Sequence, residues 1–280
     1  MIRLALLLCL AAGAALARPA SPYAFLPSDA AVDPLVDRFP TPAGFTRVKA
    51  PEGSFAAWLR HLPVWRDRVQ VQAFDGRPLH RPAAALIALD VGDRDLQQCA
   101  DTALRLHAEY LWSRGLGPRA AYHFTSGDRS SFADWVAGER FAVQGARVKR
   151  SRGKARGRDH ATYREWLMHL FRYAGTRSLA LDSTAVAADA PLVAGDFFVQ
   201  PGGPGHAVVL LDVAEHPDGR RVALIGQGFM PAEDLHVLIA AGPEDVGGAW
   251  FRLPHPGLPS LQTPSWSPFQ RDEARRFKTP

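Results

Sequence analysis

The chain has 280 residues with 47% hydrophobic content, and 33 basic against 28 acidic side chains give it a net charge of +5. Length and composition of this kind point to one globular domain with a substantial core, and they require no second domain. Beyond the N-terminus, no stretch approaches the roughly 18 uninterrupted apolar residues that a membrane span needs, which excludes stable membrane insertion of the mature chain.

Residues 1–17 have the three parts of a secretory signal. A basic start, an apolar stretch and a small-residue cleavage site follow one another as Met1-Ile2-Arg3, Leu4 to Ala12 and Ala15-Leu16-Ala17. We therefore expect the mature chain to start at Arg18 and to be periplasmic or secreted. Cys9 lies within the apolar stretch and is removed with the signal. Nucleic acid is not an expected partner in that compartment.

The mature sequence changes in composition near both ends. Residues 18–53 are rich in proline and short polar residues and form a lead-in, while residues 266–280 form a charged tail. We expect both ends to be peripheral and residues 54–265 to form the single domain.

The first part of this domain is predicted to be helical. Ser54 caps a short helix that runs to Arg60. From Asp95 to Trp112, apolar or small residues recur at helical spacing, and Gly115 ends the pattern. This longer helix carries Cys99 in its first turn.

Two further helices, at 132–136 and 163–173, precede a series of strands. Apolar runs separated by Pro-Gly and Asp-Gly turns predict strands at 197–199, 206–213, 221–225 and 235–239. Helices followed by an antiparallel sheet is an α+β order.

Seven basic side chains crowd into residues 147–158, interleaved with glycine, serine and alanine. The run has no apolar period, so we expect a solvated loop. Its functional interpretation is an electrostatic contact with an anionic polymer or a membrane face.

Cys99 is the one cysteine that remains after the signal is removed, so it cannot form a disulfide within the mature chain. It is therefore either a small core residue or a nucleophile. A helix N-terminus and a nearby imidazolium both stabilise a thiolate, which is how cysteine hydrolases obtain a nucleophile at neutral pH. His206, at the start of an apolar strand, is the best placed of the ten histidines to act as the base.

Gln227 is the predicted third member of this site. If the hairpin around Asp218-Gly219 closes through an even number of loop residues, Gln227 lies on the same sheet face as His206. Its side chain would then orient the imidazole. The alternatives are that His206 caps a strand and that Gln227 is a satisfied buried amide.

Gly195-Asp196 precedes a strand, and Gly205-His206 opens the next one. With the helix-borne thiol ahead of them, these residues resemble the papain-like cell-wall cysteine peptidases of the NlpC/P60 group. The resemblance implies a papain-like helix packed on an antiparallel sheet. Cys99 and His206 are further apart than is usual in that group, which implies a large helical insertion at about 116–194, over or beside the cleft.

Several sequence blocks also occur together in order: Cys99-Ala100-Asp101, Phe124-Thr125-Ser126-Gly127, Tyr173-Ala174-Gly175-Thr176, Gly195-Asp196 to His206-Ala207, and Gln227-Gly228-Phe229-Met230-Pro231-Ala232. Over most of the mature chain they resemble a secreted bacterial family known as domain of unknown function 4846. This resemblance implies no established activity. Glu233 follows the last block where a glutamine is expected.

Four further residues are candidates for substrate binding. Asp101 lines the same helix mouth as the thiol, although a helix-dipole role explains it equally well. Gly203 and Gly205 suit turn geometry, and their lack of side chains would let a substrate approach the strand. Trp135 offers an aromatic surface. The sequence has no metal-ligand set, phosphate loop or dinucleotide fingerprint, so no metal and no cofactor are expected.

Two functions remain open. The first is an exported papain-like cysteine hydrolase or transferase that acts on an amide bond of a cell-envelope component, such as a peptidoglycan peptide. The second is a non-catalytic envelope-binding module on the same scaffold, which binds glycan or peptide. In the second case the stacking surfaces would be large aromatic side chains: Trp112, Trp135, Trp166 and Tyr173.

Overall fold

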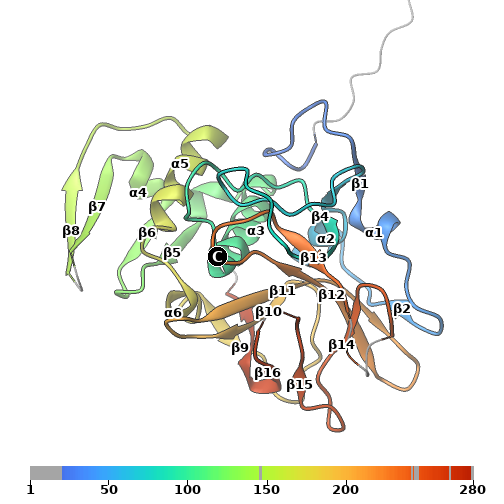
Figure 1. The fold of residues 1–280 in the computed structure, drawn as a ribbon. Helices are drawn as coiled ribbons and strands as arrows, with labels where there is room; N and C mark the ends of the chain where they lie inside the picture. Colours follow the sequence, from blue (N-terminus) through green and yellow to red (C-terminus); the bar gives the residue numbers. More distant parts are fainter. Residues whose placement is uncertain (1–20, 145–146, 241, 243–245, 265, 279–280) are drawn as a thin grey trace, which may run out of the picture.

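The structure, a computed structural model, describes residues 21–280 except 145–146, 241, 243–245, 265 and 279–280. The expected signal peptide at 1–17 and the expected start of the mature chain at Arg18 lie outside the described residues. The described chain is a mixed α/β fold with a mostly antiparallel central sheet and few helices (Figure 1). None of its described helices combines the length and the apolar composition that crossing a bilayer requires.

The central sheet has the strand order β4-β13-β12-β11-β10-β17-β9, with β14 paired to β12 and β2 paired to β11. All of these strand pairs are antiparallel. The strands are β2 (Thr46–Arg47), β4 (Ala83–Leu86), β9 (Ser183–Ala185), β10 (Asp196–Gln200), β11 (His206–Glu215), β12 (Arg221–Gln227), β13 (His236–Leu238), β14 (Trp250–Arg252) and β17 (Ala274–Phe277).

The helix α3 (Cys99–Ser113) covers one face of this sheet (Figure 1). Its apolar residues share one core with the alternate β11 residues Ala207 and Val209. The helix begins at Cys99 rather than at the expected Asp95, because the Asp95 carboxylate accepts hydrogen bonds from Ala232 N (2.6 Å) and from Gln98 Nε2 (2.9 Å). These hydrogen bonds to Asp95 therefore fix the loop that precedes the helix.

The other face of the sheet has a core of its own. The β11 residues Val208 and Leu210 pack there with Phe198 and Phe269. The segment that covers this face contains the short paired strands β15 (Ser260–Leu261) and β16 (Phe269–Gln270), followed by the turn η2 (Arg271–Glu273). The β11 strand is thus buried on both faces, as its continuous apolar run predicts.

The two ends of the chain are part of the fold rather than peripheral. The expected lead-in contributes β1 (Val32–Pro34), α1 (Leu35–Arg38) and β2, and β2 pairs with β11. It is followed by α2 (Phe55–Arg60), capped by Ser54 as predicted, and β3 (Pro63–Trp65), which pairs with β1. The expected tail contributes β17, which lies between β10 and β9.

The charged tail joins the sheet because its arginines bind side chains of the two neighbouring strands, β10 and β9. Arg276 forms an ion pair with the buried Asp196 (2.6 Å), and Arg275 donates to Ser183 Oγ (2.8 Å). Ala274 is fully buried in the core that contains Phe198 and Phe269. The boundaries 54–265 are therefore too narrow for the domain.

The expected helical insertion at 116–194 is a mixture of helices and hairpins. It contains η1 (Gly117–Arg119), β5 (Ala121–His123), β6 (Arg129–Ser131), α4 (Phe132–Val136), β7 (Glu139–Gln144), β8 (Arg147–Arg152), α5 (His160–Leu170), α6 (Thr176–Leu179) and β9. The pairs β5-β6 and β7-β8 are two-stranded sheets, and β9 belongs to the central sheet.

The basic run departs from the expected loop in its first half. Residues 147–152 form β8, which pairs with β7 in a hairpin that projects from the body at the left of Figure 1. Arg150 stabilises the hairpin, because it binds Glu139 (2.8 Å) and its guanidinium lies 5.0 Å from the centre of the Phe141 ring. Residues 153–158 lie outside any helix or strand, as predicted.

Candidate functional site

Cys99 is the first residue of α3, with Gln98 as the N-cap residue. Its thiol is 6% exposed and lies 3.9 Å from the carbonyl oxygen of Gly205. The backbone N–H of Ala207 also donates a hydrogen bond to the sulfur. The thiol therefore contacts the strand backbone on both sides of His206.

His206 and Gln227 are hydrogen-bonded to each other, with 2.9 Å between His206 Nε2 and Gln227 Oε1. The predicted proximity of these two side chains is thus confirmed. The reason differs from the predicted even loop, because Glu215 pairs with Arg221 and leaves the odd loop 216–220 between them. A bulge at Leu211 shifts the register by one residue and returns Gln227 to the face of His206.

The imidazole of His206 lies in an aromatic environment on the sheet face opposite α3. Its centroid is 4.8 Å from that of Phe229, 5.0 Å from that of Trp266 and 6.0 Å from that of Phe269. Its Nδ1 has no hydrogen-bond partner among the described residues. The thiol and the imidazole therefore lie on opposite faces of the sheet, and the expected hydrogen bond between them is not formed.

Burial governs the protonation of both groups. Burial raises the pKa of the Cys99 thiol to about 11, and the nearby Asp101 carboxylate raises it further, against the hydrogen bonds from backbone N–H groups. Burial lowers the pKa of His206 to about 4, although the hydrogen bond that the ring donates to Gln227 Oε1 favours the protonated ring. Near neutral pH the resting site therefore holds a neutral thiol and a neutral imidazole.

A pocket of about 390 Å³ opens beside Cys99. Four of the predicted site residues line it, namely Cys99, Asp101, Gly203 and Gly205. The remaining lining residues are Asp95, Leu96, Gln98, Ala100, Phe171, Arg172, Ala174, Gly175, Thr176, Gly202, Pro204 and Met230. His206 and Gln227 are not among the residues that line it.

The two predicted glycines have different roles. A Cβ atom on Gly205 would lie 2.4 Å from Thr176 Oγ1 and 2.6 Å from the carbonyl oxygen of Gln200, so close packing requires a glycine there. A Cβ atom on Gly203 would meet no atom within 4 Å. Only Gly203 faces open space, as expected of a residue that a substrate approaches.

Asp101 is buried at the mouth of the helix. One carboxylate oxygen accepts a hydrogen bond from Gln98 N (3.2 Å), whereas Oδ1 has no partner in the described chain. Burial raises the pKa of Asp101 well above its usual range, although hydrogen bonds from the N–H groups of Gln98 and of Asp101 itself oppose the shift. Asp101 is the N3 residue of the capping box of α3, which agrees with the role at the helix N-terminus that the sequence also allowed.

Trp135 is not part of the pocket. Its ring stacks against His169 (4.9 Å between centroids) and under the guanidinium of Arg140 (4.0 Å). Trp166 is fully buried and donates to Ser130 Oγ (2.9 Å). These aromatic side chains fill the core, which removes them as stacking surfaces for glycan.

The structure adds pocket residues that sequence reasoning did not select, above all Arg172 and Thr176. Thr176 Oγ1 accepts a hydrogen bond from Gly202 N (3.3 Å) and so joins the end of α5 and α6 to the loop before His206. The block Tyr173-Ala174-Gly175-Thr176 was the available signal, because it lies beside these positions.

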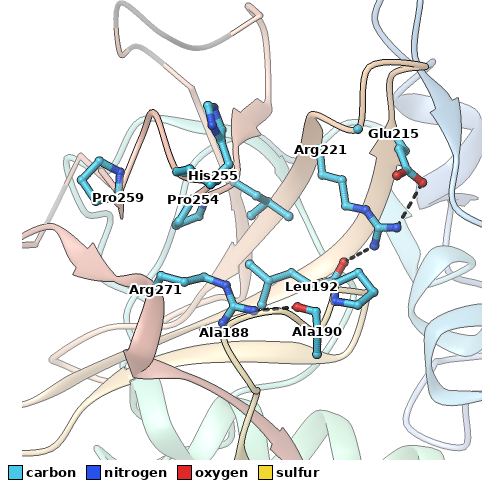
Figure 2. Close-up of a pocket in the computed structure, with 13 residues that line it drawn as sticks. Ala188, Ala190, Leu192, Glu215, Arg221, Pro254, His255, Pro259 and Arg271 are labelled. Carbon is cyan, nitrogen blue, oxygen red and sulfur yellow. Dashed lines mark hydrogen bonds and ion pairs between the residues drawn. The ribbon is translucent and has the colours of Figure 1, made fainter.

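A second pocket, of about 470 Å³, lies between residues 188–192 and 253–259 (Figure 2). Figure 2 shows that its two arginines are already engaged: Arg221 binds Glu215 (3.0 Å), and Arg271 donates to the carbonyl oxygen of Ala190 (2.7 Å). None of the predicted site residues lines it. Of these two pockets, only the one beside Cys99 is lined by predicted site residues.

Within the described residues, no group of three or more His, Cys, Asp and Glu side chains is arranged to hold a metal ion. A family model described as "Domain of unknown function (4846)" matches residues 35–276. No curated protein and no solved structure matches the chain.

Proposed function

The chain belongs to this family of unknown function, and we propose that it is an exported cysteine hydrolase or transferase of papain-like architecture. It would act on an amide bond of a cell-envelope component, such as a peptidoglycan peptide. One observation carries the proposal: a pocket-lining thiol at a helix N-terminus contacts the backbone on both sides of a histidine that a glutamine holds in place.

The proposed roles follow from the hydrogen bonds of the site. Gln227 Oε1 can only accept, so His206 Nε2 carries the proton and the neutral ring keeps a lone pair on Nδ1. Nδ1 is then the base that takes the proton of the Cys99 thiol. Backbone N–H groups in the first turn of α3 have no intrahelical acceptor and would stabilise the oxyanion.

The reaction proceeds in two balanced steps. The sulfur attacks the carbonyl carbon of the amide while its proton passes to His206 Nδ1, and the imidazolium then gives that proton to the departing amine. This leaves a thioester on Cys99. Water, deprotonated by the same nitrogen, attacks the thioester and releases a carboxylic acid and the free thiol; an amine in place of water gives transfer.

The thiol and the imidazole must approach each other before this chemistry begins. Both are neutral in the resting state, and the ring is held among Phe229, Trp266 and Phe269. Catalytic hydrogen bonds are often long or misaligned before substrate binds and tighten only in the complex. Because the imidazole lies on the sheet face opposite α3, the proposed proton transfer requires His206 to move to the α3 side of its strand when substrate binds.

The second candidate is the non-catalytic envelope-binding module. The observation in its favour is the same neutral, uncoupled pair of groups, because a thiol with a pKa of about 11 is a poor nucleophile in the resting protein. Most of the aromatic side chains predicted to stack on glycan in such a module are buried in the core. A binding module would have to use the Cys99 pocket instead.

Cleavage assays on peptidoglycan digests separate the two candidates. The purified chain is incubated with the digest, and new amine and carboxyl ends are followed by mass spectrometry. A hydrolase loses this activity in Cys99→Ala and His206→Ala and keeps it in His61→Ala, which changes an exposed histidine outside the pocket. Binding of the digest without cleavage, equal in all variants, would support the module.

A further inference from the structure

The Cys99 pocket contains an unsatisfied buried oxygen. Asp101 is only 5% exposed and lines the pocket, yet its Oδ1 has no hydrogen-bond partner among the described residues. Nearly all buried side-chain oxygens in proteins have such a partner. An orphaned oxygen on the wall of a pocket indicates that a bound group supplies the missing bond.

The state of this carboxyl group decides which bound group it can accept. Burial without a cationic partner raises the pKa of Asp101 well above its usual range, so the neutral acid is favoured. A neutral carboxylic acid donates a hydrogen bond through its O–H. The complement of Asp101 is therefore an acceptor such as a carboxylate or carbonyl oxygen.

The charged residues of the pocket point to a carboxylate in particular. Asp95 also lines the pocket, and its Oδ1 accepts hydrogen bonds from Ala232 N and Gln98 Nε2. Arg172 also lines the pocket, and within the described chain its guanidinium forms no hydrogen bond or ion pair. Arg172 is the one cationic side chain among the residues that line the pocket, and guanidinium groups bind carboxylates with two parallel hydrogen bonds.

We propose that this pocket binds a carboxylate of the substrate, with Arg172 as its ion-pair partner and the Asp101 carboxyl group as a hydrogen-bond donor. The inference rests on the proposed function and narrows its substrate to peptides with a free carboxylate close to the scissile amide. The carboxylate belongs to the C-terminal residue or to an acidic side chain. The volume of about 390 Å³ lies in the range of pockets that enclose a small ligand.

Binding measurements on the Cys99→Ala variant test the inference without any turnover. The probes are N-acetyl-dialanine, its C-terminal amide, and N-acetyl-glutamate α-amide, titrated by calorimetry at pH 6. We expect the dipeptide acid or the glutamate derivative to bind at least tenfold more tightly than the neutral amide. Comparison of the two acids identifies the source of the carboxylate.

Second-site substitutions in the same background assign the two residues. Arg172→Gln should weaken binding of the preferred acid at least tenfold and leave binding of the neutral amide unchanged. Asp101→Asn retains a donor and should keep most of the affinity, whereas Asp101→Ala should lose it. Arg152→Gln removes an exposed arginine that does not line the pocket and should have no effect.

Equal binding of the acids and the neutral amide, or unchanged binding in Arg172→Gln, would overturn the inference. Tighter binding of alaninamide, an amine probe, would show instead that Asp101 is an ionised acceptor. Failure of the proposed function is distinct: selective binding of acids with no cleavage by the wild-type chain leaves the inference intact. If neutral peptides are cleaved as fast as acidic ones, the inference is refuted and the proposal that the chain is a hydrolase still stands.

Discussion

Gln227 Oε1 lies 2.9 Å from His206 Nε2, and this contact fixes which nitrogen of the imidazole carries the proton. An amide oxygen accepts hydrogen bonds only, so Nε2 is the protonated nitrogen of the neutral ring. Nδ1, which has no partner in the described chain, keeps its lone pair. The contact therefore leaves Nδ1 unprotonated and able to accept a proton as a base.

The tautomer of His206 is the first prediction. Nitrogen-15 NMR at pH 7 should show His206 protonated at Nε2, and Gln227→Leu should mix the two tautomers because it removes the acceptor. The same substitution should cost about 1 kcal/mol of stability through the lost hydrogen bond. A wild-type ring protonated at Nδ1 would show that the amide is turned the other way and that Nδ1 is no base.

The second prediction concerns the pH dependence of Cys99. Its folded pKa of about 11 lies above the unfolded value of about 8.5, so below pH 8.5 both states hold the proton and stability is unaffected. Between these values only the unfolded thiol ionises, and the free energy of unfolding falls as pH rises, by about 3 kcal/mol in all.

Urea unfolding between pH 8 and pH 11 measures this loss, and Cys99→Ser should lack it because a hydroxyl does not ionise there. Iodoacetamide should likewise label the native thiol far more slowly at pH 8 than the urea-unfolded thiol. Rapid native labelling that levels off near pH 7 would mean that the resting thiol is already activated by its surroundings.

The third prediction uses two glycines of the same loop. Gly205→Ala should destabilise the fold by about 2–3 kcal/mol, because its methyl group would lie 2.4 Å from Thr176 Oγ1 and 2.6 Å from backbone atoms. Gly203→Ala adds a methyl group in open space and should leave the melting temperature within a degree or two.

The same two glycines distinguish an effect of packing on stability from an effect of substrate access on KM. Gly203→Ala places a methyl group in the Cys99 pocket and should raise KM for a cleaved peptide more than it lowers kcat. Equal losses of stability in both variants would contradict the assigned contacts. An unchanged KM in Gly203→Ala would place the substrate elsewhere.

The fourth prediction concerns the basic hairpin. Lys149→Gln with Arg152→Gln should leave thermal stability nearly unchanged, since both side chains are exposed. It should weaken any binding to an anionic polymer, most visibly at low salt. Arg150→Gln is the matched variant, and calorimetry should show it less stable, because Arg150 binds Glu139 and covers Phe141. Equal melting temperatures for the two variants would contradict this role of Arg150.

Helical and strand periodicity predicted the central elements well. The thiol at the start of α3 and the paired His206 and Gln227 lie where local patterns place them, since each depends on residues near in sequence. The predicted face of Gln227 is correct only because the bulge at Leu211 offsets the odd hairpin loop. A bulge within an unbroken apolar run leaves no sign in the sequence.

The errors concern elements whose partners are distant in the chain. The tail has charged residues at two consecutive positions of β17, and only the buried Asp196 explains why Arg276 is accepted in the sheet. The orientation of the His206 ring depends on Trp266 and Phe269, which follow some sixty residues later. Local patterns in the sequence carry no information about such contacts.

The central claim is that Cys99 forms a thioester with the substrate. The most direct measurement is intact-protein mass spectrometry of the wild-type chain, quenched in acid during incubation with a peptidoglycan digest. We predict a transient acyl adduct that peptide mapping places on Cys99, absent from Cys99→Ala at an unchanged melting temperature. Two results would contradict the claim. The first is cleavage that gives no adduct and is undiminished in Cys99→Ala, and the second is binding of the digest without any cleavage.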